Sequence, residues 1–292
     1  MGRHLDQWRA LVRARREQMD GQLGAVGGRP EDWWAERAAL FTRGIGDVAA
    51  SPPPGLAAIV ERLERHHTVI DVGAGAGRYA VPLARAVRHV TLVEPSPAMA
   101  RFAREQFERA GRDNWTLVEQ GWLQAEGLDP ASAVLFANVL NPHEDIEDWI
   151  DQALSLARGW LFIVHGSIPE VTPHMQRVAE AFHGEERVPQ PGISDLIPAL
   201  HDMGVYPDVL MFERRFARSY ADAGDAASQI ASTLLIEPSE DALARIRALI
   251  EPDLRERPDG RVALPTVTAP HALLIWRTAG RGDGRRWRWL RD

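Results

Sequence analysis

The 292-residue sequence contains no cysteine, no lysine and no long uncharged hydrophobic run. Without cysteine there are no disulfides, no thiolate metal ligands and no cysteine nucleophile. All 34 basic residues are arginine, which excludes a lysine Schiff base and the lysine of a phosphate-binding P-loop. No stretch approaches the roughly 20 apolar residues that cross a bilayer, and the first residues are charged. We therefore expect a cytoplasmic protein without a membrane anchor.

The charge balance bears on the class of partner. A net charge of −7 disfavours a broad nucleic-acid-binding surface, because phosphate contacts require concentrated positive charge. One local patch remains compatible with it, such as the Arg- and Trp-rich tail at 285–291, although a packed or frayed end is the simpler interpretation of that tail. A small-molecule partner is favoured, and nothing in the sequence indicates an oligomeric state.

The chain divides into a helical extension at residues 1–55 and an α/β domain at 56–292. Residues 4–19 have helical hydrophobic spacing, and glycines then break the chain before a second helix that contains Trp33, Trp34 and Phe41. These aromatic side chains either pack in the core or cover a ligand as a lid.

From residue 67 onward, short strands alternate with helices, which is typical of a parallel sheet between two helical layers. The expected strands are 68–72, 90–93, 116–118, 133–137 and 160–164, and the expected helices are 79–87, 98–110 and 146–157. The spacing therefore predicts the α/β class.

The strongest motif is a glycine-rich turn after the first of these strands. Asp71 ends a hydrophobic segment and precedes three alternating glycines, Gly73, Gly75 and Gly77. Glycine permits tight turns and lets a ligand approach the backbone closely. The nicotinamide fingerprint differs, because two residues precede its third glycine and its helix N-terminus binds a pyrophosphate. An acid at this entrance favours a ligand that carries positive charge.

Two further segments follow the second and third strands. Glu94 ends the second strand, where an acid in an open α/β sheet can accept both hydroxyl groups of a ribose. Gln120, Gly121 and Trp122 follow the third strand, where an adenine ring can stack beside the indole. Core packing is an equally good interpretation of Trp122.

These residues resemble the class I, Rossmann-like methyltransferases that depend on S-adenosylmethionine (SAM). Asp71 to Gly77 is similar to their first motif, Glu94 to their ribose-binding acid, and residues 120–122 to their adenine-edge segment. The resemblance covers about residues 67–166, and residues 271–276 look like the last strand. It implies a doubly wound, mostly parallel seven-stranded sheet in three α/β/α layers, with SAM as the cofactor. The implied cofactor-binding residues are Asp71, Gly73, Gly75, Gly77, Glu94, Gln120, Gly121, Trp122 and Asn138.

The residues that contact the methyl acceptor are expected after the fourth strand, at 138–144, because this segment faces the methyl group of SAM in such folds. Residues 141–143 lack the second proline and the aromatic residue of the Asn-Pro-Pro-aromatic motif of amino-methylating enzymes, which disfavours exocyclic amines of nucleic acids. His143 and His165 are candidate catalytic bases, because a histidine pKa near neutrality suits proton abstraction. Both are also interpretable as structural histidines. Methyl transfer depends on positioning more than on a base, so a base can be absent.

A helical segment around residues 168–203 is expected to be inserted into the domain near the acceptor. His183, Glu185 and Glu186 fall within it, but their spacing is poor for a metal site and indicates a solvated helix end. We expect no metal.

The resulting hypothesis is a SAM-dependent methyltransferase that acts on an unidentified, small-molecule acceptor. One alternative is an NAD(P)-dependent oxidoreductase with Glu94 on the ribose, which the glycine spacing disfavours. Another is a non-catalytic SAM-binding regulatory protein, which nothing in the sequence excludes.

Overall fold

The computed structural model describes four stretches of the chain and three single residues of the N-terminal region. These are residues 2–24, 52–166, 172–216 and 218–278, together with Asp32, Trp34 and Ala38. The predictions for Trp33, Phe41 and the basic tail at 285–291 lie outside the described residues.

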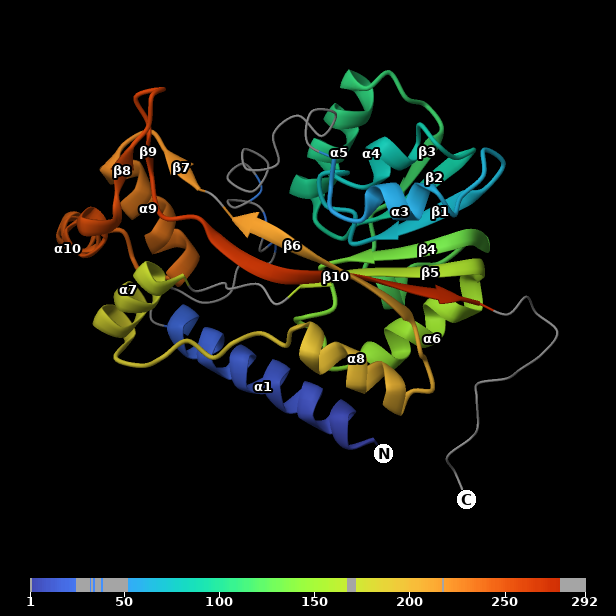
Figure 1. Ribbon diagram of the computed structural model, residues 1–292, viewed down its shortest axis with the longest axis horizontal. Helices are drawn as coiled ribbons and strands as arrows, with labels where there is room; N and C mark the ends of the chain where they lie inside the picture. Colours follow the sequence, from blue (N-terminus) through green and yellow to red (C-terminus); the bar gives the residue numbers. More distant parts are fainter. Residues whose placement is uncertain are drawn as a thin grey trace.

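A seven-stranded sheet in the order β3-β2-β1-β4-β5-β10-β6 forms the centre of the molecule (Figure 1). Its strands are β1 (Thr68–Val72), β2 (His89–Val93), β3 (Trp115–Val118), β4 (Ala131–Ala137), β5 (Ala157–Gly166), β6 (Asp208–Phe216) and β10 (Val267–Arg277). The strands from β3 to β5 are parallel, and β10 is antiparallel to both of its neighbours. This topology confirms the predicted doubly wound, mostly parallel sheet. The strand order reverses between β1 and β4, where open α/β sheets bind their ligands.

Burial on both faces explains why β1 is recognisable from the sequence. Residues 69–72 are each only 1% exposed, because helices cover both sides of the strand. The register pairs Val72 with Val93 of β2 and with Phe136 of β4. The carboxyl ends of these three strands are therefore level, and the residues that follow them share one edge.

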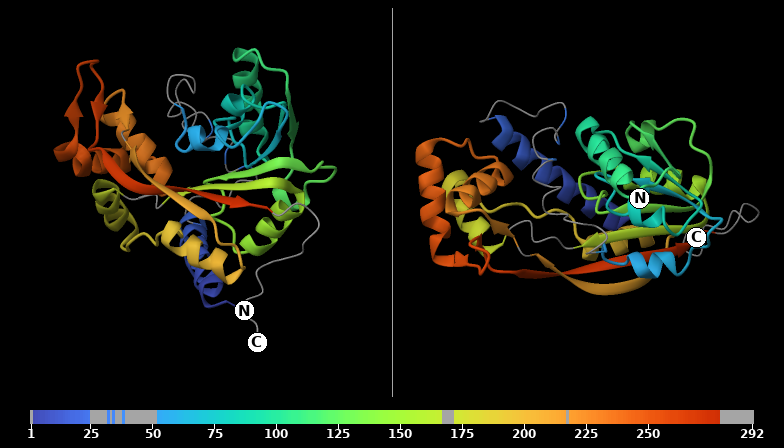
Figure 2. Two further views of the ribbon diagram at one scale, coloured as in Figure 1. Left: turned by 45° about the vertical axis from the view of Figure 1, so that its right-hand side comes forward. Right: turned by 90° about the horizontal axis from the view of Figure 1, so that it is seen from above.

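Helices cover both faces of the sheet and give three layers (Figures 1 and 2). One face carries α3 (Leu56–Val60), α4 (Ala80–Leu83) and α5 (Pro97–Arg109), and the other carries α1 (Arg3–Gly24), α6 (Ile146–Leu156) and α8 (Ile193–Asp202). A short 3-10 helix, Trp122–Gln124, follows β3. Within the described stretches, no helix is long and apolar enough to cross a membrane.

A second lobe projects from the sheet where β6 and β10 extend beyond it (Figure 1). It contains β7 (Ser219–Tyr220), α9 (Ala223–Leu234), α10 (Glu240–Ile250), a 3-10 turn (Glu251–Asp253), β8 (Arg255–Glu256), β9 (Val262–Ala263) and α7 (Pro173–His183). These elements have a hydrophobic core of their own, which includes Val178, Ile230 and Ile246. Of the segment expected to be inserted at 168–203, only α7 joins this lobe, whereas α8 packs on the sheet. Most of the lobe comes from the connection between β6 and β10.

The N-terminal helix α1 docks on the sheet beside α8. Leu5, Trp8 and Val12 lie on its buried face, and Trp8 has no exposed surface. Asp202, at the end of α8, accepts hydrogen bonds from the backbone N–H groups of His4 and Leu5 at 2.7 and 3.1 Å. This carboxylate satisfies donors that the first turn of a helix otherwise leaves unpaired. The amphipathic helix predicted at residues 4–19 is confirmed.

We predict that Trp8→Ala lowers the free energy of unfolding by about 3–5 kcal/mol, because it removes a fully buried indole and leaves a cavity. Urea denaturation followed by circular dichroism measures the change. Glu17→Ala, on the exposed face of the same helix, is the matched control and should change stability by less than about 0.5 kcal/mol. Equal stabilities of the two variants would contradict the docking of α1.

Candidate functional site

The glycine-rich turn connects β1 to α4 in an unusual backbone conformation. Gly73 and Gly75 have φ angles of +62° and +55°, in the left-handed region where other residues are strained. A Cβ added to Gly73 would lie 2.6 Å from Val139 Cγ1, and one added to Gly75 would lie 3.2 Å from Met99 Cε. Gly77 packs against α4 and α5. The turn therefore requires glycine both for conformation and for close approach.

Glu94 connects this turn to the loop after β2. Its carboxylate accepts a hydrogen bond from Gly75 N–H at 2.8 Å and another from Ser96 N–H at 2.9 Å. The residue is 5% exposed, and burial raises the pKa of its carboxyl group. A carboxylate has about four acceptor positions, so Glu94 keeps capacity for two more donors, such as ribose hydroxyls.

Asp71 places a second buried acid beside Glu94. Burial, then the charge of Glu94, raises the pKa of Asp71 to about 8, while an N–H of Ala80 opposes the shift. Asp71 Oδ2 is buried and has no hydrogen-bond partner among the described residues. An unsatisfied buried oxygen next to a second acid is a position that a positively charged ligand would stabilise.

The N-terminal extension adds a third acid to this edge of the sheet. The Ser96 hydroxyl donates to both oxygens of Asp32, at 3.0 and 3.1 Å, and Trp34 N–H donates to Asp32 at 2.9 Å. The charge of Asp32 contributes to the raised pKa of Glu94. No local sequence pattern marks this contact, because Asp32 and Ser96 are 64 residues apart.

Residues 120–122, predicted to border the adenine, differ in burial: Trp122 lies in the core, whereas Gln120 lies on the surface. Trp122 is 2% exposed, donates its indole N–H to the backbone oxygen of Trp149 at 3.1 Å, and packs edge-on against Phe136. Gln120 is exposed, and its side chain accepts a hydrogen bond from Glu126 N–H. Gly121 lies close to Gln124. This placement matches core packing of Trp122, and the adenine contact stays a prediction.

Asn138 occupies the turn immediately after β4. It is one of two non-glycine residues with positive φ in the described part of the chain, at 56°. Its N–H donates to Val164 O at 2.8 Å, whereas its buried Oδ1 has no partner among the residues described. A strained backbone with an unsatisfied amide oxygen at this edge is typical of a functional position.

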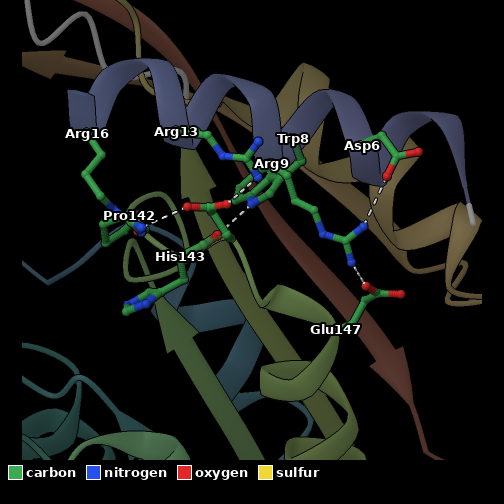
Figure 3. Close-up of polar contacts among 9 residues, drawn as sticks. Asp6, Trp8, Arg9, Arg13, Arg16, Pro142, His143 and Glu147 are labelled. Atoms are coloured by element: carbon green, nitrogen blue, oxygen red, sulfur yellow. Dashed lines mark hydrogen bonds and ion pairs between the residues drawn. The ribbon is translucent and has the colours of Figure 1, made fainter. Parts of the chain in front are cut away.

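The loop after Asn138 carries His143 and is held by α1 (Figure 3). Trp8 Nε1 donates to the backbone oxygen of His143 at 2.8 Å, and Arg16 donates to Pro142 O at 3.1 Å. Arg13 and Arg16 also form ion pairs with Glu144 in the same loop. The helix therefore fixes the backbone of this loop.

Both candidate histidines are held in the neutral form. Burial lowers the pKa of His143 to about 4, and its ring lies 4.0 Å from that of Trp149. Burial likewise lowers the pKa of His165 to about 4; this side chain has no exposed surface, and its Nε2 lies 3.2 Å from Pro191 O. Complete burial of His165 favours a structural role. His143 is only partly buried and remains the candidate base at the carboxyl edge of the sheet.

Within the described stretches, the segment predicted at 168–203 has no group of side chains that could bind a metal ion. His183 Nε2 lies 2.8 Å from Leu234 O, which ties α7 to α9. No group of three or more histidine, aspartate or glutamate side chains could hold a metal ion, as far as the described residues go.

The centre of the chain matches a known protein family. Residues 69–159 match a family described as a methyltransferase domain, and this segment contains the glycine turn, Glu94 and Asn138. No curated protein matches the chain by sequence.

Solved structures with a similar fold are of low sequence identity. A protein from Bacillus halodurans C-125, provisionally named a methyltransferase, has a TM-score of 0.53 and 17% identity, over 80% of this chain and 99% of that one. The YcgJ protein from Bacillus subtilis has a TM-score of 0.50 and 14% identity, over 78% and 99%. Magnesium protoporphyrin IX methyltransferase from Synechocystis PCC 6803, solved with bound SAH, has a TM-score of 0.49 and 15% identity, over 83% and 95%. The first two share the fold of this chain.

We predict that Asp71 makes the unliganded protein less stable as pH rises. The folded chain retains a proton on Asp71 up to about pH 8, whereas the unfolded chain releases it near the ordinary pKa of 3.8, so the free energy of unfolding falls between these values. Asp71→Asn cannot ionise and should lose less stability from about pH 5 to about pH 8, by on the order of 3 kcal/mol.

Urea denaturation at several pH values measures this difference. Asp129→Asn, which alters an exposed acid, is the matched control and should follow the wild type. The same pH dependence in the wild type and in Asp71→Asn would show that Asp71 does not hold a proton in the folded chain.

Proposed function

We propose that this chain is a class I SAM-dependent methyltransferase and that it transfers a methyl group to a small-molecule acceptor at the carboxyl edge of β1, β2 and β4. The observation that carries the proposal is the pair of buried acids at this edge, Asp71 and Glu94, beside a turn of left-handed glycines. Two buried acids that are close enough to interact are unfavourable when both are ionised, which helps to raise the pKa of Asp71, and a ligand with positive charge would stabilise the ionised pair. SAM carries both a sulfonium and an amino group.

The described residues fit the parts of SAM in an order that follows the sheet. Asp71 would accept from the amino group, the backbone at Gly73 and Gly75 would lie against the methionine portion, and the free acceptor positions of Glu94 would take the ribose hydroxyls. Residues 120–122 would border the adenine, with Gln120 and Gly121 more accessible than the buried Trp122. When bound, SAM supplies a methyl group activated for in-line displacement.

The acceptor would approach the turn at Asn138. The unsatisfied Oδ1 of Asn138 offers an acceptor for a hydroxyl or amine of the substrate. The neutral His143 can accept a proton only weakly, because its pKa of about 4 is far below neutrality. Positioning is therefore the main contribution of this edge, as expected for displacement at a sulfonium.

A small molecule is favoured over nucleic acid on two grounds. The net charge is −7, and the loop after β4 lacks the motif of amino-methylating enzymes. The acid pair argues against an NAD(P)-dependent oxidoreductase, because a pair of buried acids disfavours the negative charge of a pyrophosphate at this turn. A non-catalytic SAM-binding protein is distinguished by turnover: methylated product formed from a panel of small hydroxyl, amine and carboxyl compounds supports the enzyme.

We predict that SAM and its demethylated product SAH raise the melting temperature, whereas NAD and NADP do not. A ligand that binds only the folded state at a hundred times its Kd adds about 2.7 kcal/mol of stability. Differential scanning fluorimetry measures the shift. Stabilisation by the nicotinamides but not by SAM would overturn the proposed cofactor.

We predict that Glu94→Ala weakens SAM binding at least about tenfold. The substitution removes charge-assisted hydrogen bonds to the ribose and also releases the N–H of Gly75, which loosens the turn. Isothermal titration calorimetry measures the affinity. Glu119→Ala is the matched control, since Glu119 lies after β3, is exposed and pairs only with Arg104 among the described contacts. Equal SAM affinity in both variants would place the ribose elsewhere.

A further inference from the structure

Exposed hydrophobic side chains are concentrated on the edge strand β6 and the short segment before it. Val209, Leu210 and Met211 are 42%, 47% and 51% exposed, and Tyr206, three residues before Val209, is 44% exposed. These four are the only exposed large hydrophobic side chains among the described residues. Single exposed apolar side chains are ordinary on a protein surface, but a contiguous group of them indicates an interaction surface.

The outer edge of β6 also offers backbone groups for pairing. β6 is the last strand of the sheet, no strand in the described part of the chain pairs with its outer side, and it lies at the margin of the molecule when seen from above (Figure 2). Its nine residues contain no proline and pair with β10 without a register shift. Edge strands that resist association are short, or are interrupted by charges, proline or a bulge. The opposite edge strand β3 has only four residues, whereas β6 is long and uncharged from 209 to 212.

A second copy of the same strand fits this edge in the antiparallel orientation. When a two-fold axis perpendicular to the sheet relates two such strands, one residue lies opposite itself. An axis at Met211 places Leu210 opposite Phe212 of the second copy, so the uncharged centres of both strands coincide. A hollow of about 290 Å³, lined by residues 211–213 and 268–270, lies beside the axis and gives side chains of the second copy room.

The charged residues of β6 favour this register over its neighbour. With the axis at Met211, Asp208 lies opposite Arg214 of the second copy, and the same pair recurs on the other side of the axis. Opposite charges that face each other across antiparallel strands are stabilising. An axis at Phe212 would instead place Arg214 opposite Leu210 and bring no acid opposite a base. We propose that β6 is a homodimer interface, in which two copies of this chain pair antiparallel about Met211 and join their sheets.

Sedimentation velocity of the full chain measures this association. We expect a reversible monomer–dimer equilibrium between roughly 1 and 100 μM, the range in which small interfaces dissociate. Met211→Lys places two ammonium groups opposite each other at the axis and should weaken the dimer at least about tenfold. Thr116→Lys adds the same charge at an exposed position of the opposite edge strand β3, so it is the matched control and should dimerise like the wild type. Circular dichroism checks that both variants are folded.

Asp208→Arg tests the charged pairs without altering the apolar centre of the strand. It places arginine opposite Arg214 on both sides of the axis, and the repulsion should weaken the dimer about fivefold or more. Asp129→Arg reverses the charge of an exposed acid outside β6 and is the matched control, with the dimer affinity of the wild type expected.

The absence of cysteine allows the register to be tested directly. Met211→Cys places two thiols opposite each other with Cα atoms about 4.5–5.5 Å apart, which is within the range of a disulfide. Mild oxidation should therefore link two chains, as seen by gel electrophoresis without reductant. Val209→Cys is the matched control on the same face of β6, because its two copies lie four residues apart along the strands, roughly 13 Å, and cannot be linked.

The outcomes decide between a second copy and any other occupant of this edge. Weaker dimers of Met211→Lys and Asp208→Arg, together with cross-linking of Met211→Cys but not of Val209→Cys, support the interface. It is overturned by a chain that stays monomeric up to about 100 μM, by a dimer that Met211→Lys leaves unchanged, or by cross-linking of Val209→Cys in place of Met211→Cys. A monomer in which the thiol of Met211→Cys is protected from a thiol-specific dye would assign the edge to another segment of the chain and likewise overturns it. None of these measurements requires SAM, so failure of the proposed function would leave the result unaffected.

Discussion

The two hydrogen bonds to the Glu94 carboxylate hold the functional edge of the sheet together. One comes from Gly75 in the turn after β1 and the other from Ser96 in the turn after β2, so a single side chain sets the distance between the two turns. Ser96 also contacts Asp32, which brings the N-terminal extension to the same place. Because these bonds form in a buried environment, they cost the carboxylate its hydration, and ionisation of Asp71 beside it would add repulsion. Two ionised acids at this edge are therefore electrostatically unfavourable, which is the condition that makes a cationic ligand bind well.

The strand order places the proposed cofactor site and the proposed acceptor approach at neighbouring strand ends. Asp71 and Glu94 are buried at the ends of β1 and β2, which are paired in parallel. The turn at Asn138 lies next to them, because β4 is the neighbour of β1 on its other side. One edge of the sheet therefore carries both parts of the proposed site.

The centre of the fold could be predicted because its signals are local. The residues of β1 are buried on both faces and, apart from Asp71, form a hydrophobic run, and the glycines that follow are typical of a tight turn. The connection between β6 and β10 could not be predicted in the same way. Val209, Leu210 and Met211 on the edge strand β6 are successively 42%, 47% and 51% exposed, so they do not alternate as a half-buried strand would. At the site, Asp71 and Glu94 could be placed from strand ends, but the position of Asp32 depends on its contact with the distant Ser96. The burial of His165 was likewise invisible, because it arises where α1, β5 and residue 191 meet.

The helix α1 has a mechanical consequence, because it contacts both the loop after β4 and the segment that leaves α7. Near its middle it holds the loop at 142–144, and towards its end Gln18 exchanges hydrogen bonds with the backbone of Glu186 and Val188, in the segment that leaves α7 of the second lobe. A helix of 22 residues is about 33 Å long and resists bending. A shift of α7 relative to the sheet would therefore reach the loop after β4 both along α1 and through the hydrogen bond from Asn141 Nδ2 to Pro191 O. The second lobe and this loop are coupled through α1, so the proposed position of the acceptor depends on how tightly α1 packs on the sheet.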